Sequence, residues 1–342
     1  MRYILTILIL SWVLSGCEEE GGNLQPGKDS GFKYIDTTEL IGSSSLQFPL
    51  VTNPEFISVA ATEFLNKGDN VYIYNHNNNI YIYPVKSLYI EIVNQSFKNK
   101  LISMTYCPVT GSGLAVDRII DGDTLLFRAS GLRYKENLMP YDNINESIWS
   151  QMLMKCVKGK YSGKTYEVLP IVETNWSTAK EVYPNANVLS QEPEESKKEY
   201  HFISHKSTKS PGPENGNGDN TPISDNSKVF GTLEGSGPLI AEYNDFPDDS
   251  IAVIKHAGSS TVFVGSQKPR FIMAFKINTS AKFQGVQNSL PTVMKDSDGN
   301  YYDWFGNVVK GSRQGSTLEV PNYYTAYWWS WKDFFSSFSH IQ

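Results

Sequence analysis

The stretch that decides the fold is MTYCPVTGSGLAVDRIIDGDTLLFRASGLRYKENLMPYDNINESIWSQ, residues Met104–Gln151. It opens with β-rich residues that end near Pro108, because proline lacks a backbone N–H group for the sheet. Leu114–Ile120 and Thr124–Ala129 alternate between apolar and polar residues, and Asp121-Gly122-Asp123 between them is a hairpin signal. We therefore predict β-strands joined by tight turns over this stretch.

Cys107 stands at the end of the first predicted strand, before a Gly-rich turn with free backbone N–H groups. Such a position suits a nucleophile or a ligand, and it also suits an inert buried thiol, which base rates favour. Asp117 and Arg118 are the candidates for setting the local charge, although strand alternation places them on opposite faces. Their alternative role, which we favour, is a buried ion pair or loop-fixing hydrogen bonds.

A set of short motifs between residues 104 and 190 carries a family resemblance. The motifs include Tyr106-Cys107-Pro108-x-Thr110-Gly111-Ser112, Asp117-Arg118, Ser130-Gly131-Leu132, Leu138-Met139-x-Tyr141-Asp142 and Ser147-x-Trp149-Ser150-Gln151. They resemble the DUF3179 family, a set of bacterial proteins without an assigned activity. Upstream, Glu91-Ile92-Val93-Asn94 is similar to that family's Trp-His-Glu-Ile-Val-Asn-Asp segment. On this resemblance, the candidate binding residues are Tyr106, Cys107, Thr110, Gly111, Ser112, Trp149 and Gln151.

The chain departs from the family pattern at three positions. Ile90 stands where the family has His, Gln95 where it has Asp, and Thr110 where it often has a second Cys. A metal site built from that His and those cysteines would be incomplete in this chain. We therefore predict no metal site and name no cofactor.

The N-terminus has the pattern of a lipoprotein leader over residues 1–17. Arg2 precedes the apolar run Tyr3–Val13, which is too short to span a bilayer as a helix, and Leu14-Ser15-Gly16-Cys17 matches a lipobox. We expect cleavage before Cys17 and lipidation of that residue, which anchors the chain in the cell envelope at the outer membrane. The alternative is an ordinary secretory leader with a chance cysteine.

Composition divides the rest of the chain into two lobes and two connecting segments. Residues 18–41 are polar and predict a tether, whereas residues 191–228, with their charged and Pro/Gly-rich runs, predict a linker. The first, DUF3179-like lobe spans residues 42–190 and the second spans residues 229–342. His201 and His205 in the linker have i, i+4 spacing but lack the surrounding pattern of a metal site.

An internal repeat relates the two lobes. Residues 157–183 align without gaps with residues 309–335 at an offset of 152, and nine of the 27 positions are identical. Each copy predicts two Gly turns, a short strand, a loop and a helix led by Trp176 or Trp328. The predicted fold is therefore mainly β (α+β), with two related β-rich lobes that each end in this unit.

The second lobe has no Cys-Pro-Val-Thr-Gly segment. The nearest stretch is Lys255–Ser259, in which His256 stands where the first lobe has Cys107. If a pseudo-twofold axis relates the lobes, Cys107 and His256 meet in one cleft, which makes His256 a candidate catalytic partner. The other cysteine after the leader, Cys156, occupies a place typical of a small buried residue, so we predict two separate thiols.

Charge and composition favour a binding protein and argue against nucleic acid as a partner. Loss of the leader changes the formal net charge from −6 to −7, and no basic stripe is present. The 20 Tyr and 7 Trp suit a glycan- or peptide-binding face as well as a core. Without an assembled acid–base or nucleophile set, we predict a lipid-anchored, non-catalytic binding or interaction protein for a small molecule, a glycan or a protein. The alternative is a thiol- or metal-dependent enzyme that uses Cys107.

Overall fold

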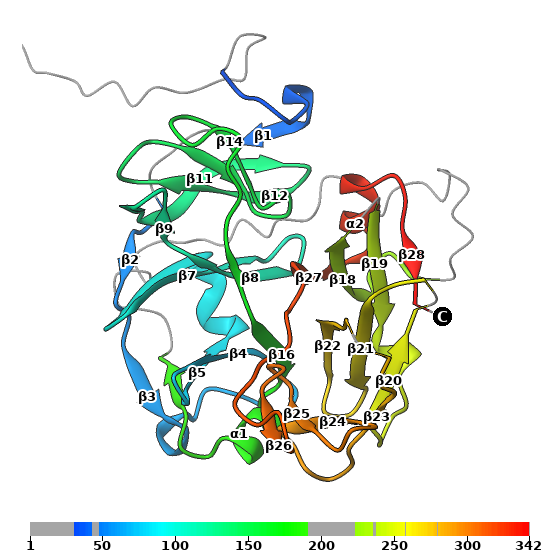
Figure 1. Ribbon diagram of the computed structural model, residues 1–342. Helices are drawn as coiled ribbons and strands as arrows, with labels where there is room; N and C mark the ends of the chain where they lie inside the picture. Colours follow the sequence, from blue (N-terminus) through cyan, green and yellow to red (C-terminus); the bar gives the residue numbers. More distant parts are fainter. Residues whose placement is uncertain are drawn as a thin grey trace, which may run out of the picture.

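The computed structural model of the chain describes residues 31–42, 48–190, 223–234, 237–256, 258–278 and 280–341. In these residues, strands form six main sheets and one two-stranded ribbon, and the helices are short (Figure 1). The predicted mainly β fold is confirmed. We call the sheets of the first half of the chain 1a, 1b and 1c, and their counterparts in the second half 2a, 2b and 2c.

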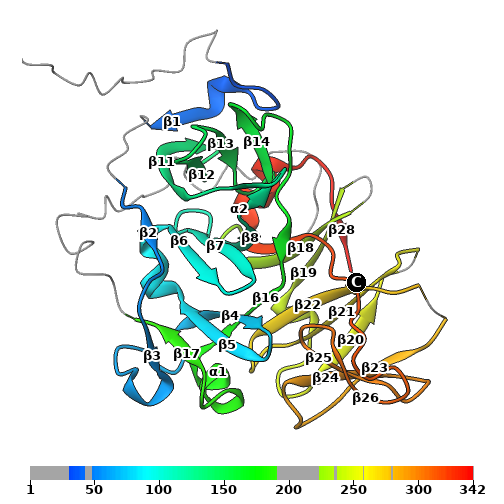
Figure 2. The same ribbon diagram turned by 60° about the vertical axis from the view of Figure 1, so that its left-hand side comes forward.

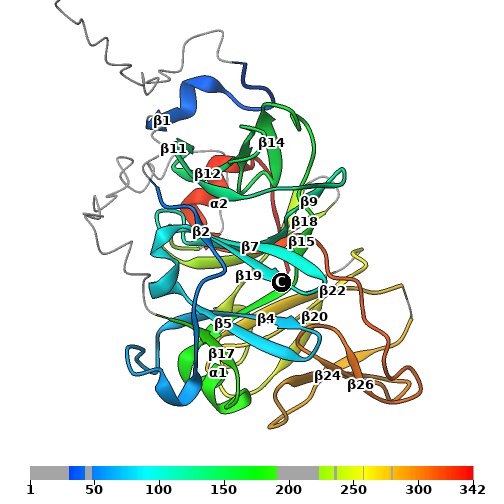
Figure 3. The same ribbon diagram turned by 90° about the vertical axis from the view of Figure 1, so that its left-hand side faces the viewer.

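The first half of the chain supplies three five-stranded sheets, whose strands are named in their spatial order. Sheet 1a contains β16 (Ile171–Asn175), β4 (Asn70–His76), β5 (Asn79–Pro84), β17 (Asn187–Leu189) and β3 (Phe56–Ser58). Sheet 1b contains β15 (Val168–Leu169), β8 (Ser112–Asp117), β7 (Lys100–Cys107), β6 (Ile92–Phe97) and β2 (Val51–Thr52). Sheet 1c contains β1 (Leu40–Gly42), β11 (Phe127–Tyr134), β12 (Asn137–Asp142), β13 (Ile148–Ser150) and β14 (Lys155–Lys158). Figure 3 shows these sheets one below another, from 1c at the top to 1a at the bottom.

The second half repeats this plan with fewer strands. Sheet 2a contains β27 (Tyr323–Tyr327), β18 (Lys228–Glu234), β19 (Gly237–Glu242) and β28 (Ser339–His340). Sheet 2b contains β20 (Ala252–Lys255), β21 (Thr261–Ser266) and β22 (Phe271–Lys276). Sheet 2c contains β23 (Phe283–Gly285), β24 (Thr292–Asp296), β25 (Tyr301–Asp303) and β26 (Val308–Lys310). The remaining elements are the ribbon β9 (Ile119–Ile120) and β10 (Asp123–Thr124), the helices α1 (Trp176–Val182) and α2 (Trp328–Phe334), and the 3-10 helices η1 (Thr37–Glu39), η2 (Val59–Ala61), η3 (Val85–Ile90) and η5 (Tyr243–Asp245).

The internal duplication is confirmed element by element. β16 and α1 have the same bounds as β27 and α2 at the offset of 152. Trp176 and Trp328 each begin a helix directly after a strand, so the loop predicted between strand and helix is absent from both copies. The isolated β-bridge Lys155↔Thr165 recurs as Asn307↔Thr317 at the same offset. The two copies therefore share backbone geometry as well as sequence.

The identical glycines of the repeat have a conformational cause. Gly159 and its counterpart Gly311 have φ angles of +96° and +118°. Residues with a Cβ rarely adopt this left-handed region, whereas glycine enters it without steric cost. Both copies consequently need glycine where the chain turns before the last strand and helix.

The two largest hydrophobic cores each draw on both halves of the chain. The first core unites sheet 1a and α1 with sheets 2b and 2c, and the second core unites sheet 2a and α2 with sheets 1b and 1c. Figure 1 shows α1 beside β25 and β26 of sheet 2c, and Figure 2 shows α2 beside sheet 1c. Trp304 Nε1 donates to the Tyr183 hydroxyl at 3.0 Å on one side, and Phe334 packs edge-on against Tyr134 on the other. The repeated units are therefore interleaved, and neither buries its core alone.

Two predicted segment boundaries differ from the structure. Residues 31–41, assigned to the tether, belong to the fold because β1 pairs with β11 and Leu40 is buried. Lys228, assigned to the linker, is the first residue of β18 and pairs with Tyr327. Residues 1–30 and 191–222 lie outside the described residues, and with them Cys17, His201 and His205.

Candidate functional site

Cys107 is buried at the end of β7, with only 1% of its surface exposed. It packs in the second core, and its thiol donates to the Glu136 carbonyl oxygen at 3.7 Å. Burial raises the pKa of the Cys107 thiol, and the charge of Glu91 raises it further. Cys156 is also buried and unbridged, and burial raises its pKa to about 11. The prediction of two separate thiols is confirmed, and both are held in the neutral, unreactive form.

The candidate binding residues that follow Cys107 form a closed polar network with Asn137. The Thr110 and Ser112 hydroxyls lie 2.8 Å apart, and Ser112 Oγ donates to Gln151 Oε1 at 2.7 Å. Asn137 Nδ2 lies 3.0, 3.1 and 2.8 Å from the side-chain oxygens of Thr110, Ser112 and Gln151. All four side chains are at most 1% exposed. They therefore satisfy one another, as buried polar groups must.

The aromatic binding candidates, Tyr106 and Trp149, are buried as well. The Tyr106 ring lies between Tyr72 and Tyr89, with centroids 6.3 Å from each, and Trp149 stacks on Tyr166 at 4.5 Å. A ligand at this place would have to displace packed rings and the polar network. The binding role of these residues stays a prediction.

Asp117 and Arg118 lie at the opposite end of the β7–β8 hairpin from Cys107. Asp117 forms a salt bridge with Lys100 at 2.5 Å. The Arg118 guanidinium donates to the Leu125 carbonyl oxygen at 2.9 Å and to three further oxygens, which interrupts the strand predicted over residues 114–120. The loop-fixing hydrogen bonds of Arg118 are confirmed, and Asp117 forms an ion pair that is partly rather than fully buried. Both residues lie at the far end of the hairpin from Cys107 rather than beside it.

His256 does not occupy the counterpart position of Cys107. β7 and β21 are the central strands of sheets 1b and 2b, and Cys107 ends β7 as Ser266 ends β21. His256 follows β20 on the side of the β20–β21 connection, at the far end of β21 from Ser266. The predicted meeting of Cys107 and His256 in one cleft is wrong, because the sequence match aligned the wrong end of the hairpin.

Two counterpart turns bring the halves together. Residues 108–111 join β7 to β8, and residues 267–270 join β21 to β22, so each turn has four residues. Each ends in a left-handed residue, Gly111 at φ +65° and Arg270 at φ +52°. The two turns thus share their length and a left-handed last residue, while no residue is identical at an equivalent position.

Each turn contacts the strand that precedes the other half's helix. The Tyr327 N–H donates to the Thr110 carbonyl oxygen at 2.9 Å. In the counterpart contact, Asn175 Nδ2 donates to the Lys268 carbonyl oxygen, also at 2.9 Å. Each half therefore contacts the other's turn, and both turns border the space between the halves.

Large side chains fill the Gly111 side of this space. A Cβ on Gly111 would lie 2.9 Å from Lys228 Cε and 2.9 Å from Tyr327 Cε2. Lys228 Nζ also donates to the Gly111 carbonyl oxygen. In sheet 2a, Lys228 pairs with Tyr327 at the end of the β18–β27 pairing. In sheet 1a, Asn70 pairs with Asn175 at the same end of the β4–β16 pairing, so these two residues are the first-half counterparts. The side chains that face the Arg270 turn, Asn70 and Asn175, are therefore shorter than Lys228 and Tyr327, which face the Gly111 turn.

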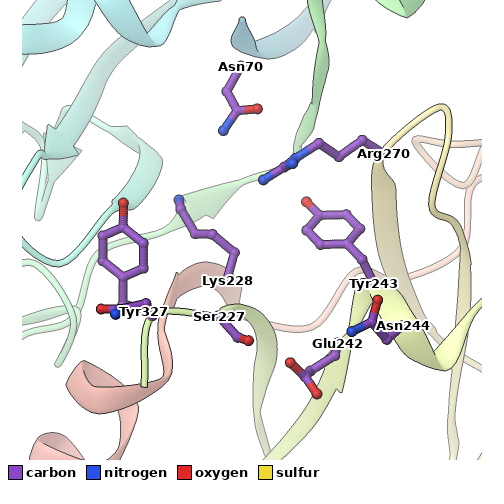
Figure 4. Close-up of a pocket in the computed structure, with 9 residues that line it drawn as sticks. Asn70, Ser227, Lys228, Glu242, Tyr243, Asn244, Arg270 and Tyr327 are labelled. Carbon is purple, nitrogen blue, oxygen red and sulfur yellow. The ribbon is translucent and has the colours of Figure 1, made fainter. Parts of the chain in front are cut away.

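A pocket of about 290 Å³ opens between the halves at this place. Figure 4 shows the Lys228 ammonium and the Arg270 guanidinium pointing toward the same space, with the Asn70 amide above them. The Tyr327 and Tyr243 hydroxyls lie on either side. Four residues from the second half and one from the first thereby converge on one opening.

Glu173 on β16 neutralises one of the two cations. Its Oε1 lies 3.6 Å from Lys228 Nζ and 3.5 Å from Asn70 Nδ2, and its side chain is 6% exposed. Burial lowers the pKa of the Lys228 amine; Glu173 opposes this shift and Arg270 adds to it. The carboxylate therefore offsets part of the cost of burying the ammonium.

Aromatic rings hold both cations in place. Arg270 lies over the Tyr243 ring at 5.1 Å, and Lys228 Nζ lies over the Tyr327 ring at 5.5 Å. Burial raises the pKa of both tyrosine hydroxyls, so they remain protonated donors at neutral pH. Arg270 Nε is buried without a hydrogen-bond partner among the described residues. The pocket offers positive charge and donors, which is chemistry for binding an anion.

The described ranges contain no ligand set for a metal ion. Over these ranges, no group of three His, Cys, Asp or Glu side chains is placed to hold one.

Sequence reasoning does not identify Lys228, Arg270 or Tyr243. Lys228 falls in the predicted linker, and Arg270 ends a turn without likeness to its counterpart. The signal that points to the pocket is the duplication itself. Tyr327 stands directly before Trp328 in the aligned repeat, and its strand partner is Lys228.

Comparison with known proteins identifies a family for this chain. No curated protein and no solved structure gives a significant match. The family described as "Protein of unknown function (DUF3179)" matches residues 46–338. This range includes both halves, the network beside Cys107 and the pocket between the halves. The chain therefore belongs to the DUF3179 family.

Proposed function

We propose that this chain is a non-catalytic binding protein of the cell envelope, and that the pocket between its halves holds a small polar ligand. The observation that carries the proposal is the convergence of Lys228 and Arg270 on one open space (Figure 4). Keeping two cations side by side costs free energy through mutual repulsion, and a bound anion relieves that cost. Ligand sites commonly combine such a pocket with a few converging polar groups.

The state of Cys107 supports binding over thiol chemistry. A nucleophilic cysteine needs an accessible thiolate and an activating cation or base. The Cys107 thiol is buried, its pKa is raised, and it donates to a carbonyl oxygen. The alternative of a thiol-dependent enzyme therefore has no geometric support.

A lipid anchor at Cys17 is part of the same proposal. The lipobox Leu14-Ser15-Gly16-Cys17 after a charged and apolar leader supports it, with the outer membrane as the location. None of the helices in the described ranges is long and apolar enough to cross a membrane. Cys17→Ser should release the chain from the membrane fraction. A Cys17→Ser chain that still fractionates as a processed membrane lipoprotein would refute the anchor.

A thermal-shift screen tests the binding function. Small polar molecules, charged and neutral, are added to the purified chain, and the hits are repeated on two variants of Asn244, an exposed pocket residue. Asn244→Trp places an indole at the mouth of the pocket, whereas Asn244→Ala leaves it open. Hits should raise the melting temperature of the wild type and of Asn244→Ala but not of Asn244→Trp. If no compound gives a shift that Asn244→Trp abolishes, the pocket is not a ligand site.

A further inference from the structure

The charge balance of the pocket fits a single negative charge. Lys228 and Arg270 contribute two positive charges, and the buried Glu173 removes one. Glu242 also lines the pocket, but in Figure 4 its carboxylate points away from both cations. One uncompensated positive charge suits a carboxylate better than a phosphate dianion, which would leave a net negative charge in a partly desolvated place.

The remaining lining groups are neutral and hydrogen-bonding. They are the side chains of Asn70, Asn226, Ser227, Asn244, Tyr243 and Tyr327. Each amide offers a donor and an acceptor, and each hydroxyl offers both as well. Among the residues that the structure describes, no aliphatic side chain lines the pocket, and the two Tyr rings are already covered by cations. A ligand with several hydroxyl groups matches this lining, whereas an acyl chain does not.

The size of the pocket limits the ligand to about one sugar ring. Its volume of about 290 Å³ is at the lower end of the range for small-molecule sites. A hydroxylated ring with one carboxylate fits the charge, the lining and the size together. We propose that the pocket recognises one uronic-acid residue, either a free sugar acid or the end of an acidic glycan. This inference rests on the proposed binding function and specifies its ligand.

Calorimetric titration of the purified chain tests this ligand class. The compounds are glucuronate, glucose, inorganic phosphate and a short oligosaccharide that ends in glucuronate. Glucuronate should bind at least about tenfold more tightly than glucose, because its carboxylate accepts a charge-assisted hydrogen bond that glucose lacks. A tighter oligosaccharide identifies the glycan end as the source of the ligand, and equal affinity identifies the free sugar acid.

Matched variants of the turn locate the binding site. Arg270→Gln removes the pocket cation, and Lys268→Gln removes an exposed cation of the same turn, which pairs with Asp249 at 2.7 Å. We expect Arg270→Gln to weaken glucuronate binding at least about tenfold, and Lys268→Gln to change it less than about twofold. The double variant Lys228→Met with Glu173→Gln should weaken binding similarly, because it removes the ion pair without leaving a buried lone charge.

The outcomes separate this inference from the binding function. Equal affinity for glucose and glucuronate, tighter binding of phosphate, or equal effects of Arg270→Gln and Lys268→Gln would each overturn the uronic-acid assignment. If glucuronate does not bind while another compound gives a shift that Asn244→Trp abolishes, the ligand class is wrong and the binding function stands. If neither is seen, both fail.

Discussion

The turns at residues 108–111 and 267–270 have the same length and both end in a left-handed residue, but they differ in what they contact. The first closes a buried polar network and lies against Lys228 and Tyr327. The second directs the Arg270 side chain into a pocket. After the duplication, one turn packs tightly against the other half, whereas the other turn presents a cation to the pocket.

The comparison also separates two reasons for a glycine. Arg270 shows that a left-handed residue with a side chain is accepted at this position of the turn, at φ +52°. Gly111 adopts nearly the same conformation but has no room for a Cβ. The close approach of Lys228 and Tyr327, more than the dihedral angle, therefore requires glycine in the first turn.

The largest expected difference between the two turns is the loss of stability when their last residue, Gly111 or Arg270, is replaced by alanine. Gly111→Ala should reduce the free energy of unfolding by about 2–5 kcal/mol, which combines left-handed strain with overpacking. Arg270→Ala introduces no new strain, because the position already carries a Cβ, and should cost about 1 kcal/mol or less. Urea unfolding of both variants measures the difference. Equal losses would show that dihedral strain alone governs the two turns.

The next largest effect is expected from the polar network. β22 begins with Phe271 where β8 begins with Ser112, so the second half has apolar packing at the place of this network. Asn137→Leu removes a donor shared by three buried oxygens and the acceptor of the Met152 N–H. We expect a loss of about 2–3 kcal/mol, because buried polar groups are left without partners. A loss below about 0.5 kcal/mol in urea unfolding would contradict a closed network.

Cys107 and its counterpart Ser266 offer a smaller, sharper test. Both are buried and bond to a carbonyl oxygen, Cys107 to that of Glu136 and Ser266 to that of Asp248. Cys107→Ala should cost on the order of 1–2 kcal/mol, as expected for a small buried side chain. In Cys156→Ala, alkylation of Cys107 should require unfolding at every pH. Rapid labelling of the folded protein below neutral pH would instead support the alternative hypothesis, a thiol-dependent enzyme that uses Cys107.

The smallest expected effect is a pH dependence that only the first half has. Burial raises the pKa of Glu91 from its ordinary 4.5 to about 7, and the charge of Arg133 opposes this shift. The folded state binds this proton more tightly than the unfolded state, so stability is full below pH 4.5 and is lost as the pH rises toward 7. Glu91→Gln should remove that loss, on the order of 1 kcal/mol for a half-buried side chain.

Unfolding at pH 5 and pH 8 checks the Glu91 prediction. The wild type should be less stable at pH 8 than Glu91→Gln, and the two should be nearly equal at pH 5. The second half has Ile251 and Ala252 where β20 begins, so it supplies no matching carboxyl. A parallel pH profile for both proteins would place the titrating group elsewhere.

Features that depend on residues adjacent in the sequence could be predicted from the sequence alone. Alternation and turn residues identify the β class, the β7–β8 region and the Asp121–Asp123 hairpin, because strand and turn geometry depends on a few adjacent side chains. The duplication can also be detected from the sequence, because the identical glycines form left-handed turns in both copies, and Trp176 and Trp328 each begin a helix.

The exchange of helices and the pocket were decided only by the tertiary structure. Asn70, Glu173, Lys228 and Arg270 lie far apart in the chain, and no local pattern relates them. Which of the two turns is packed and which borders an open pocket depends on the side chains that face each turn from the other parts of the fold. The position of the pocket therefore depends on packing between segments that are distant in the sequence. The sequence alone determined the repeated framework, and the tertiary structure decided where that framework leaves a pocket.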